Sequence, residues 1–262
     1  MPSKDRQREM ARKKLERRMA LRAASARRRR RIYAGIGAGV TLIALLTVTI
    51  VLVINSGDDQ SHTAISPTCA YLDARAGKDH IKDVGKPSTA HVPDAGIANV
   101  AVKTNFGQLD LALDRAVAPC SVNSFVHLVK QGFYDNTHCH RLTTSVLFVL
   151  QCGDPFGDSL GGPSYQFGVE NTPTNDHPPY PVVSVAMARD PKDPNSNASQ
   201  FFIVYKDSPE LTAEYSLIGK VTGGLDVITD KIVPGGIKNE KMPGSGDGEP
   251  AKEVKISQAQ LK

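Results

Sequence analysis

The longest apolar stretch of the chain lies near its N-terminus. Residues 32–54 are 23 positions without a charged side chain, and they directly follow five consecutive arginines. As a helix that rises ~1.5 Å per residue, this segment would reach ~34 Å, enough to cross a hydrocarbon core of ~30 Å. A buried core helix of this length would carry a polar stripe, and a cleaved signal peptide would have a shorter apolar region before a small-x-small site. The pattern predicts an uncleaved transmembrane signal anchor over 32–54.

The hydrophobic pattern changes twice after this segment. Residues 55–97 are rich in Ser, Thr, Asp, Pro and Gly without a sustained period, which is typical of a flexible linker. From residue 98 to 262, short apolar runs separated by turn residues predict a mainly β domain, and many short strands favour a barrel. The run 100–113 predicts a hairpin around a turn at 105–107. Further strands are predicted at 147–150, 182–186, 201–205, 216–221 and 254–256, and helices from Ala118-Pro119 to Gly132 and over 225–232.

Charge separates the two ends of the chain. Residues 1–31 contain 14 Lys and Arg against 3 Asp and Glu, whereas the remainder contains 18 against 24. The chain is thus a tail of local charge +11 joined to a body of −6, and the overall charge of +5 describes neither part. Arginines before the apolar segment, and Asp58 and Asp59 after it, indicate a cytoplasmic tail (1–31) and an extracytoplasmic linker and domain. The expected location is the cell membrane, crossed once.

The basic tail suits two kinds of partner. Arginine clusters neutralise phosphates, so the tail could bind nucleic acid. Its position directly against a membrane favours anionic lipid headgroups instead. We therefore expect the tail to contact anionic membrane lipids, and we expect no nucleic-acid partner.

All four cysteines lie beyond the apolar segment, at Cys69, Cys120, Cys139 and Cys152. An even number of cysteines in a compartment expected to be oxidising indicates disulfides. The sequence contains no C-x-x-C pair and no histidine spacing typical of zinc, so no metal is predicted. Four cysteines allow three pairings, which the sequence alone leaves open, and unpaired buried thiols are the alternative.

Two separated motifs in the outer domain point to chemistry. One is Asn195-Ser-Asn-Ala-Ser-Gln-Phe-Phe-Ile203, a turn of small residues that leads into Gln200-Phe-Phe202, and the other is Cys139-His-Arg141, about sixty residues upstream. In this order and spacing they resemble the active-site signature of the cyclophilins, the peptidyl-prolyl cis-trans isomerases, in a bacterial membrane-anchored form. The resemblance covers about residues 98–258. It implies a closed antiparallel eight-stranded β-barrel capped by two α-helices, and a reaction without metal or cofactor.

The reaction implied is rotation about X-Pro bonds. This rotation is slow, ~10–100 s, because the amide barrier is ~20 kcal/mol. In the twisted transition state the nitrogen becomes pyramidal and its lone pair can accept a hydrogen bond. A fixed cation beside that nitrogen stabilises the twisted state more than either planar state.

The resemblance assigns roles to individual residues of this chain. Arg141 is the cation, and Gln151 orients it. Phe148, counted with these two as catalytic, holds the proline ring together with Phe202 and Leu211. The other substrate contacts implied are Val149, Ala188, Arg189, Gln200 and Tyr215. His140 is expected to be structural, since the reaction transfers no proton.

The chain departs from the family pattern in the same region. Nine residues separate Arg141 from Gln151, two more than in the usual pattern, and Arg189 replaces an asparagine. Glu210 stands at the position of a tryptophan on the pocket rim, which removes roughly 200 Å² of potential aromatic contact. We therefore expect weak or no binding of cyclosporin, the family's cyclic-peptide inhibitor.

These departures leave two functions open. The favoured one is an isomerase that acts on X-Pro bonds of exported proteins, with proline-containing polypeptides as partners. The alternative is a catalytically weak cyclophilin-like module that binds proline-containing peptides as a scaffold.

The resemblance also bears on the disulfides. If the family hairpin holds, Cys139 and Cys152 lie on adjacent antiparallel strands that flank the 141–151 loop, where directly opposed Cβ atoms are ~4.5–5.5 Å apart. It thus implies a Cys139–Cys152 bond that clamps the base of the loop. Cys69–Cys120 would then tie the linker to the start of the first helix.

Overall fold

The computed structural model describes residues 68–75, 77–174 and 178–262. The predicted basic tail (1–31), the predicted transmembrane anchor (32–54) and residues 55–67 of the predicted linker lie outside these ranges and stay predictions. Within the described ranges, no helix is both long and apolar enough to span a bilayer.

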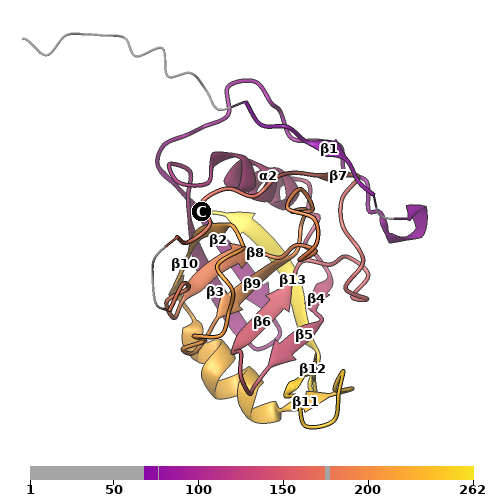
Figure 1. Ribbon diagram of the computed structural model, residues 1–262, viewed down its shortest axis with the longest axis vertical. Helices are drawn as coiled ribbons and strands as arrows, with labels where there is room; N and C mark the ends of the chain where they lie inside the picture. The colour runs from indigo at the N-terminus through magenta and orange to yellow at the C-terminus, as the bar shows by residue number, and fades with distance from the viewer. Residues whose placement is uncertain (1–67, 76, 175–177) are drawn as a thin grey trace, which may run out of the picture. The chain divides into compact units, whose positions relative to one another are not determined.

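An antiparallel sheet of eleven strands forms the body of the domain (Figure 1). The strands follow the order β11-β12-β5-β6-β9-β8-β10-β3-β2-β13-β4. On β3, for example, Leu109, Leu111 and Leu113 are buried at every second position, as the period of a half-buried strand requires. The strands are β2 (Ile97–Thr104), β3 (Gly107–Asp114), β4 (Thr137–Cys139), β5 (Arg141–Thr143), β6 (Val149–Cys152), β8 (Ser184–Met187), β9 (Phe201–Val204), β10 (Leu217–Gly223), β11 (Ile237–Lys238), β12 (Asp247–Pro250) and β13 (Val254–Leu261).

The sheet is curled, and it differs from the predicted closed barrel of eight strands in number and in closure. Within the described residues, the hydrogen-bonded order begins at β11 and ends at β4, and these two strands do not pair with each other. The reason lies at His140, where one strand is split into two. β4, which ends at Cys139, pairs with β13, whereas β5, which begins at Arg141, pairs with β12 and β6. The Cys139–Cys152 disulfide joins β4 to β6 across this bend.

The longer strands of the structure were predicted, and its shortest strands were not. The hairpin is β2–β3, in which Val100 faces Leu111. The runs at 147–150, 182–186, 201–205 and 216–221 correspond to β6, β8, β9 and β10. The sequence did not indicate β4, β5, β11 or β12, nor the separate pair of β1 (Leu72–Asp73) and β7 (Tyr165–Gln166), which have two to four residues each. Strands of this length are too short to show an alternating pattern.

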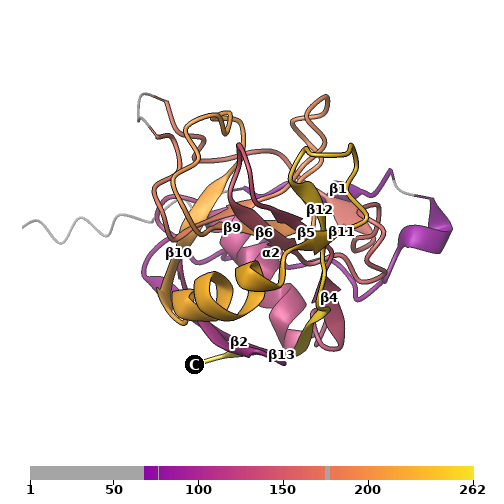
Figure 2. The ribbon, with the colours of Figure 1, turned by 90° about the horizontal axis from the view of Figure 1, so that it is seen from below.

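One of the two predicted helices is a regular α-helix. In α2 (Pro119–Lys130), Pro119 occupies the first turn, where its missing N–H costs nothing, and Phe125 and Leu128 belong to the buried face. The predicted helix over 225–232 is instead a π-helical turn, η2 (Val227–Ile232), followed by a 3-10 turn, η3 (Val233–Gly235). Gly236, with φ 74°, ends this segment. Figure 2 views the sheet from the end that η2 and η3 cover, with α2 at the far end.

From residue 68 onward, the segment predicted as a linker is packed against the domain. We call residues 68–75 and 77–96 the strap; they include a 3-10 turn, η1 (Lys78–His80). A disulfide joins Cys69 to Cys120 at the start of α2, and β1 pairs with β7. The buried Tyr71 ring packs edge-on against Tyr165 and Phe167, with centroids 5.4 and 5.6 Å away. Both disulfides that the resemblance implied are therefore present, and the strap is part of the folded unit.

Candidate active site

A cavity of about 250 Å³, apolar on one side, opens beside β6 and β9. Val149 and Phe202 line it from these adjacent strands, and Leu211 and Tyr215 line it from the segment between β9 and β10. Phe202 is only 4 % exposed, and its ring lies 6.1 Å from that of Tyr180 and 5.2 Å from that of Tyr215. The ring is held from two sides, so the cavity is preformed and suits a small aliphatic ring.

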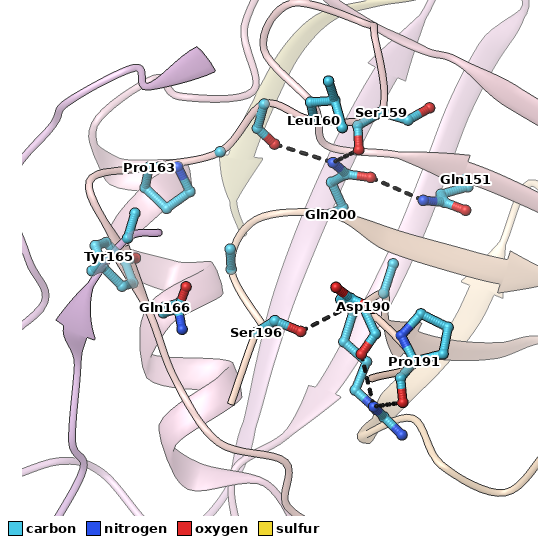
Figure 3. A pocket seen from close by; sticks show the side chains of 16 residues that line it. Gln151, Ser159, Leu160, Pro163, Tyr165, Gln166, Asp190, Pro191, Ser196 and Gln200 are labelled. Carbon is cyan, nitrogen blue, oxygen red and sulfur yellow. Dashed lines mark hydrogen bonds between the residues drawn. The ribbon is translucent and has the colours of Figure 1, made fainter. Parts of the chain in front are cut away.

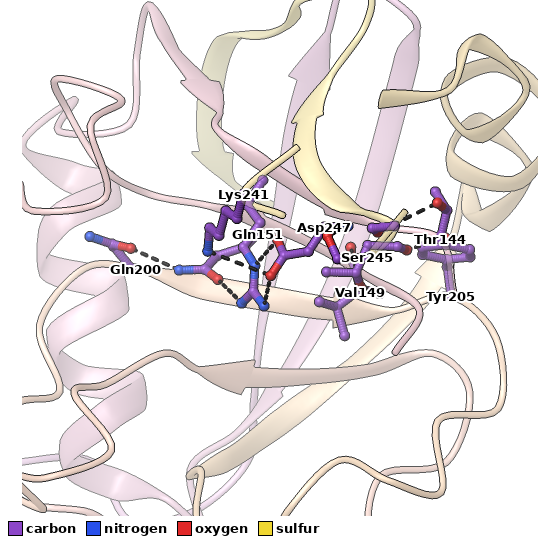
Figure 4. Close-up of polar contacts among 11 residues, drawn as sticks. Thr144, Val149, Gln151, Gln200, Tyr205, Lys241, Ser245 and Asp247 are labelled. Carbon is purple, nitrogen blue, oxygen red and sulfur yellow. Dashed lines mark hydrogen bonds and ion pairs between the residues drawn. The ribbon is translucent and has the colours of Figure 1, made fainter. Parts of the chain in front are cut away.

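Polar side chains line another side of this cavity. The β5–β6 ladder sets Arg141 opposite Gln151. Arg141 Nη1 donates to Gln151 Oε1 at 3.1 Å, and Gln151 Nε2 donates to Gln200 Oε1 at 2.9 Å (Figure 4). Gln200 Nε2 in turn donates to the carbonyls of Ser159 and Gly161, at 3.2 and 3.1 Å. Adjacent strands thus build a relay of side chains that fixes the guanidinium at the cavity.

Arg141 has a further partner that the sequence did not predict. Asp247, the first residue of β12, accepts hydrogen bonds from Arg141 Nε and Nη2, each 2.8 Å long, and Lys241 Nζ lies 3.6 Å from the same carboxylate (Figure 4). Partial burial acts to raise the pKa of Asp247, but the hydrogen bonds and charge of Arg141 and Lys241 outweigh it and lower the pKa below its usual value. Asp247 stands 106 positions from Arg141, and no sequence motif joins the two.

Phe148 was predicted to hold the proline ring, and the structure places it outside the cavity. Val149 and Gln151 face the cavity, so strand alternation turns the preceding Phe148 to the other side. Its ring lies 6.0 Å from that of Tyr205, and Lys206 Nζ lies 4.4 Å from its centroid. Leu147 lines the cavity in its place. The cavity therefore has a leucine where the sequence predicted a phenylalanine.

Ala188 and Arg189 separate this cavity from a larger one. Although Arg189 lines both cavities, its side chain is only 7 % exposed. Its guanidinium donates to the backbone carbonyls of Glu214, Asp190 and Pro191, at 2.8, 2.9 and 3.2 Å. Arg189 thus braces the loop that bears it, and its hydrogen-bonding capacity is directed to the protein.

The larger cavity measures about 450 Å³ and is shown in Figure 3. It shares Gln151, Ala188, Arg189 and Pro191 with the first cavity, so the two are adjacent. Gln200, predicted as a substrate contact, lines this larger cavity, and Ala74 of the strap contributes to its lining. An extended chain seated in the first cavity could continue into the second.

A third cavity, of about 270 Å³, lies on the other side of Arg141 and Leu147. Val146 and Glu210 line it, and both are exposed. No described residue forms a hydrogen bond or an ion pair with Glu210. Glu210 is thus an exposed residue at this third cavity.

Comparison with known proteins decides the family. Residues 99–261, more than half of the chain, match the family described as cyclophilin type peptidyl-prolyl cis-trans isomerase/CLD. The chain belongs to this family. Among its relatives, the probable peptidyl-prolyl cis-trans isomerase B of Mycobacterium leprae (strain TN) is 41 % identical over 214 residues, which cover 77 % of this chain and 69 % of that protein. The protein of the same name from Mycobacterium tuberculosis (strain H37Rv) is 44 % identical over 192 residues, covering 69 % of this chain and 60 % of that protein.

The cyclophilin fold is also found by comparison with solved structures. The crystal structure of a Cryptosporidium parvum cyclophilin type peptidyl-prolyl cis-trans isomerase has a TM-score of 0.52 and 28 % sequence identity, and the match covers 64 % of this chain and 98 % of that one. A second structure of that protein, in the presence of the dipeptide Ala-Pro, has a TM-score of 0.51 and 29 % identity, covering 63 % and 98 %.

The cyclophilin domain brings most of the predicted site residues together. Gln200 lies in the neighbouring cavity, and Phe148 lies in neither cavity. The structure adds Leu147, Pro191 and Lys241 to the lining of the central cavity. The predicted residues that line this cavity are Arg141, Val149, Gln151, Ala188, Arg189, Phe202, Leu211 and Tyr215.

His140 sits between β4 and β5 of the cyclophilin domain and is 5 % exposed. Burial lowers the pKa of His140 to about 4, against a smaller opposing effect of the Asp154 charge. Neither ring nitrogen forms a hydrogen bond with a described residue. His140 is therefore neutral at physiological pH and fills space next to Arg141, which favours the structural interpretation.

Proposed function

We propose that the cyclophilin domain accelerates rotation about X-Pro bonds, with Arg141 stabilising the twisted amide. One observation above all supports this: a guanidinium fixed by three hydrogen bonds lines a cavity whose opposite side is apolar. The cavity holds the proline ring through Val149, Phe202 and Leu211. The proline ring then stays fixed while the residue before it rotates about the X-Pro bond.

The chemistry follows from the donors that remain on Arg141. A guanidinium has five N–H groups, and here two bind Asp247 and one binds Gln151. Among the described residues, one N–H on each terminal nitrogen has no partner. Such an N–H can donate to the lone pair that the proline nitrogen gains when the amide twists. Because the charge is permanent and in place before the substrate arrives, it stabilises the twisted state with little reorganisation.

The substrates proposed are polypeptides that contain proline. The Cryptosporidium parvum relative was crystallised in the presence of Ala-Pro, which supports a dipeptide unit as the minimal ligand. In this chain, adjacent cavities of about 450 and 270 Å³ leave room for flanking residues.

We further propose that these polypeptides are exported proteins. Two disulfides in the described part of the chain support an oxidising compartment. The predicted anchor over 32–54 supports attachment to the membrane, and the tail is proposed to contact anionic lipids. Weak cyclosporin binding stays a prediction, supported by the exposed Glu210 at the third cavity.

The test is a prolyl isomerisation assay on the full chain in detergent, with Arg141→Ala and Arg141→Lys. We expect Arg141→Ala to lower kcat/KM by on the order of 10²–10³-fold, because the donors at the reacting nitrogen are lost. Arg141→Lys should be intermediate, since a point charge replaces a planar fork. Lys130→Ala, an exposed cation at the end of α2, serves as the control.

Peptide binding separates the enzyme from the alternative of a scaffold. A proline peptide should bind wild type and Arg141→Ala with similar Kd, because the apolar side of the cavity is intact. If the folded wild type binds the peptide but does not accelerate its isomerisation, the domain is a binding scaffold. If Arg141→Ala keeps full activity, the assigned mechanism is wrong.

A further inference from the structure

The contact between Asp247 and Arg141 is built by the sheet. β12 pairs with β5 so that Asp247 lies opposite Thr143, and Thr143 and Arg141 project on the same face of β5. Asp247 is therefore a diagonal cross-strand neighbour of Arg141, at a separation that long side chains can bridge. The two side chains are 23 % and 25 % exposed, so the pair is largely withdrawn from solvent.

The main chain of Asp247 is itself fixed on both sides. Its carbonyl accepts a hydrogen bond from the N–H of Lys241 at 2.9 Å, and its N–H donates to Ser245 Oγ at 3.2 Å. The adjacent Gly246 accepts from the N–H of Thr144 at 2.8 Å. The backbone that carries the carboxylate is thus fixed within the loop 241–247, and the loop is tied to the chain that follows β5.

The geometry of the pair fixes the plane of the guanidinium. Two parallel hydrogen bonds of 2.8 Å run from Nε and Nη2 to the two oxygens of Asp247, and Gln151 holds Nη1 from another direction at 3.1 Å. A bidentate pair prevents the guanidinium from rotating in its plane and from tilting out of it. The two N–H groups without a described partner therefore project in fixed directions from the terminal nitrogens.

The charges around Asp247 indicate that it orients Arg141 without cancelling the positive charge at the cavity. Lys241 Nζ lies 3.6 Å from the carboxylate that binds Arg141, so one anion is shared by two cations. The three groups together keep a net positive charge beside the cavity. A carboxylate bound to Arg141 alone would cancel more of the charge that the twisted amide needs.

We infer that Asp247 is a positioning residue for isomerisation, which orients the Arg141 guanidinium toward the proline nitrogen. The inference rests on the proposed function, because it assigns to Asp247 an action on Arg141 alone. Asp247 contributes to the rate of rotation and little to the binding of the peptide. Without it, Arg141 keeps its charge and its link to Gln151 but loses its fixed plane.

The experiment compares Asp247→Ala and Asp247→Asn with wild type in the full chain. Line-shape NMR on a short X-Pro peptide gives the isomerisation rate and the affinity separately. We expect Asp247→Ala to lower kcat roughly tenfold, as misplacement of a reacting group does, with KM changed less than about twofold. Asp247→Asn keeps one oxygen acceptor and the same shape, and should lose less.

Glu249→Gln is the matched control. Glu249 lies on the same strand and, by alternation, the same face as Asp247, but it contacts Lys238 at 3.8 Å and is not in the cavity lining. Its kcat should equal that of wild type. In an Arg141→Ala background, Asp247→Ala should have no further effect, because the residue acts through Arg141.

The outcomes separate this inference from the proposed function. If Arg141→Ala abolishes activity while both Asp247 variants keep the wild-type kcat, the positioning role is wrong and the isomerase mechanism stands. A higher kcat in these variants would also overturn it and would show that Asp247 restrains the cation. If Arg141→Ala is fully active, the proposed mechanism fails first. Thermal unfolding identifies a variant that does not fold, and the near-isosteric Asp247→Asn then decides alone.

Discussion

The polar and apolar walls of the central cavity are held in place in different ways. On the polar wall, Arg141 and Gln151 are linked by a side-chain hydrogen bond, and each is also held by a residue outside the cavity lining, Asp247 for Arg141 and Gln200 for Gln151, up to 106 positions away in the chain. On the apolar wall, Phe202 and its neighbours are fixed by strand alternation and by contact between rings.

This difference teaches where each wall is vulnerable. A hydrogen-bonded relay loses its geometry when one member is removed, because each donor has one acceptor. A packed wall loses mainly the surface of the residue removed, plus a cavity that its neighbours fill only in part. We therefore expect changes on the polar wall to reduce kcat, and changes on the apolar wall to weaken peptide binding and stability.

The largest expected effect on the apolar wall is that of Phe202→Ala. Phe202 is 4 % exposed and lies against two tyrosine rings, so its loss removes most of the surface that holds a proline ring. We expect kcat/KM to fall by about 10²-fold through KM, as measured by isomerisation kinetics. The truncation should also lower the free energy of unfolding by roughly 3–5 kcal/mol.

Phe202→Leu keeps the domain packed and serves where the alanine variant unfolds. It should lose less affinity than Phe202→Ala and leave the kcat of the bound peptide nearly unchanged. A fall in kcat with unchanged affinity would contradict the division between the two walls.

The second prediction concerns how the free energy of unfolding depends on pH through His140, the neighbour of Arg141. The pKa of the buried His140 is about 4 in the folded state, against 6.5 for an ordinary histidine. Between these values the unfolded chain binds more protons than the folded one, so stability is complete above pH 6.5 and is lost as the pH falls toward 4. We expect a loss on the order of 2–3 kcal/mol in the free energy of unfolding over this window, measured by denaturant titration at several pH values.

His140→Gln should flatten this dependence, whatever its effect on stability at pH 7. His91→Gln is the control, since His91 is exposed in the strap. An unchanged slope in His140→Gln would assign the acid sensitivity to other groups.

The sequence predicted the elements whose signal is local. The β2–β3 hairpin has eight residues in each strand, and α2 has twelve residues with a proline at its start, so periodicity was sufficient. The turn η2–η3 was mistaken for an α-helix, because its apolar spacing does not distinguish the two. The prediction of a closed barrel of eight strands was wrong in number and in closure. The division at His140 depends on how β13 and β12 pair with β4 and β5, which no local pattern indicates.

The candidate site shows the same limit. Arg141, Gln151 and Phe202 could be predicted because a motif surrounds each of them. Asp247 could not, because its contact arises only when β12 docks on β5, and an aspartate in a glycine-rich turn is ordinarily a surface residue. The predicted contact at Phe148 is displaced by one position to Leu147. A displacement of one position matters because neighbouring side chains of a strand point to opposite faces.

The smallest expected effect tests this displacement at Leu147 and Phe148. Leu147 lines the central cavity, whereas Phe148 packs against Tyr205 and Lys206 on the other side. We expect Leu147→Ala to lower kcat/KM by roughly fivefold through loss of apolar contact with the substrate. Phe148→Ala should lower the melting temperature but change kcat/KM less than about twofold. Both side chains are partly buried, and Phe148→Ala removes the larger one, so a greater kinetic loss in Leu147→Ala reflects the face that is altered. A larger kinetic effect of Phe148→Ala than of Leu147→Ala would place the phenylalanine in the proline cavity after all, and would extend the apolar wall beyond the side chains that β6 and β9 direct inward.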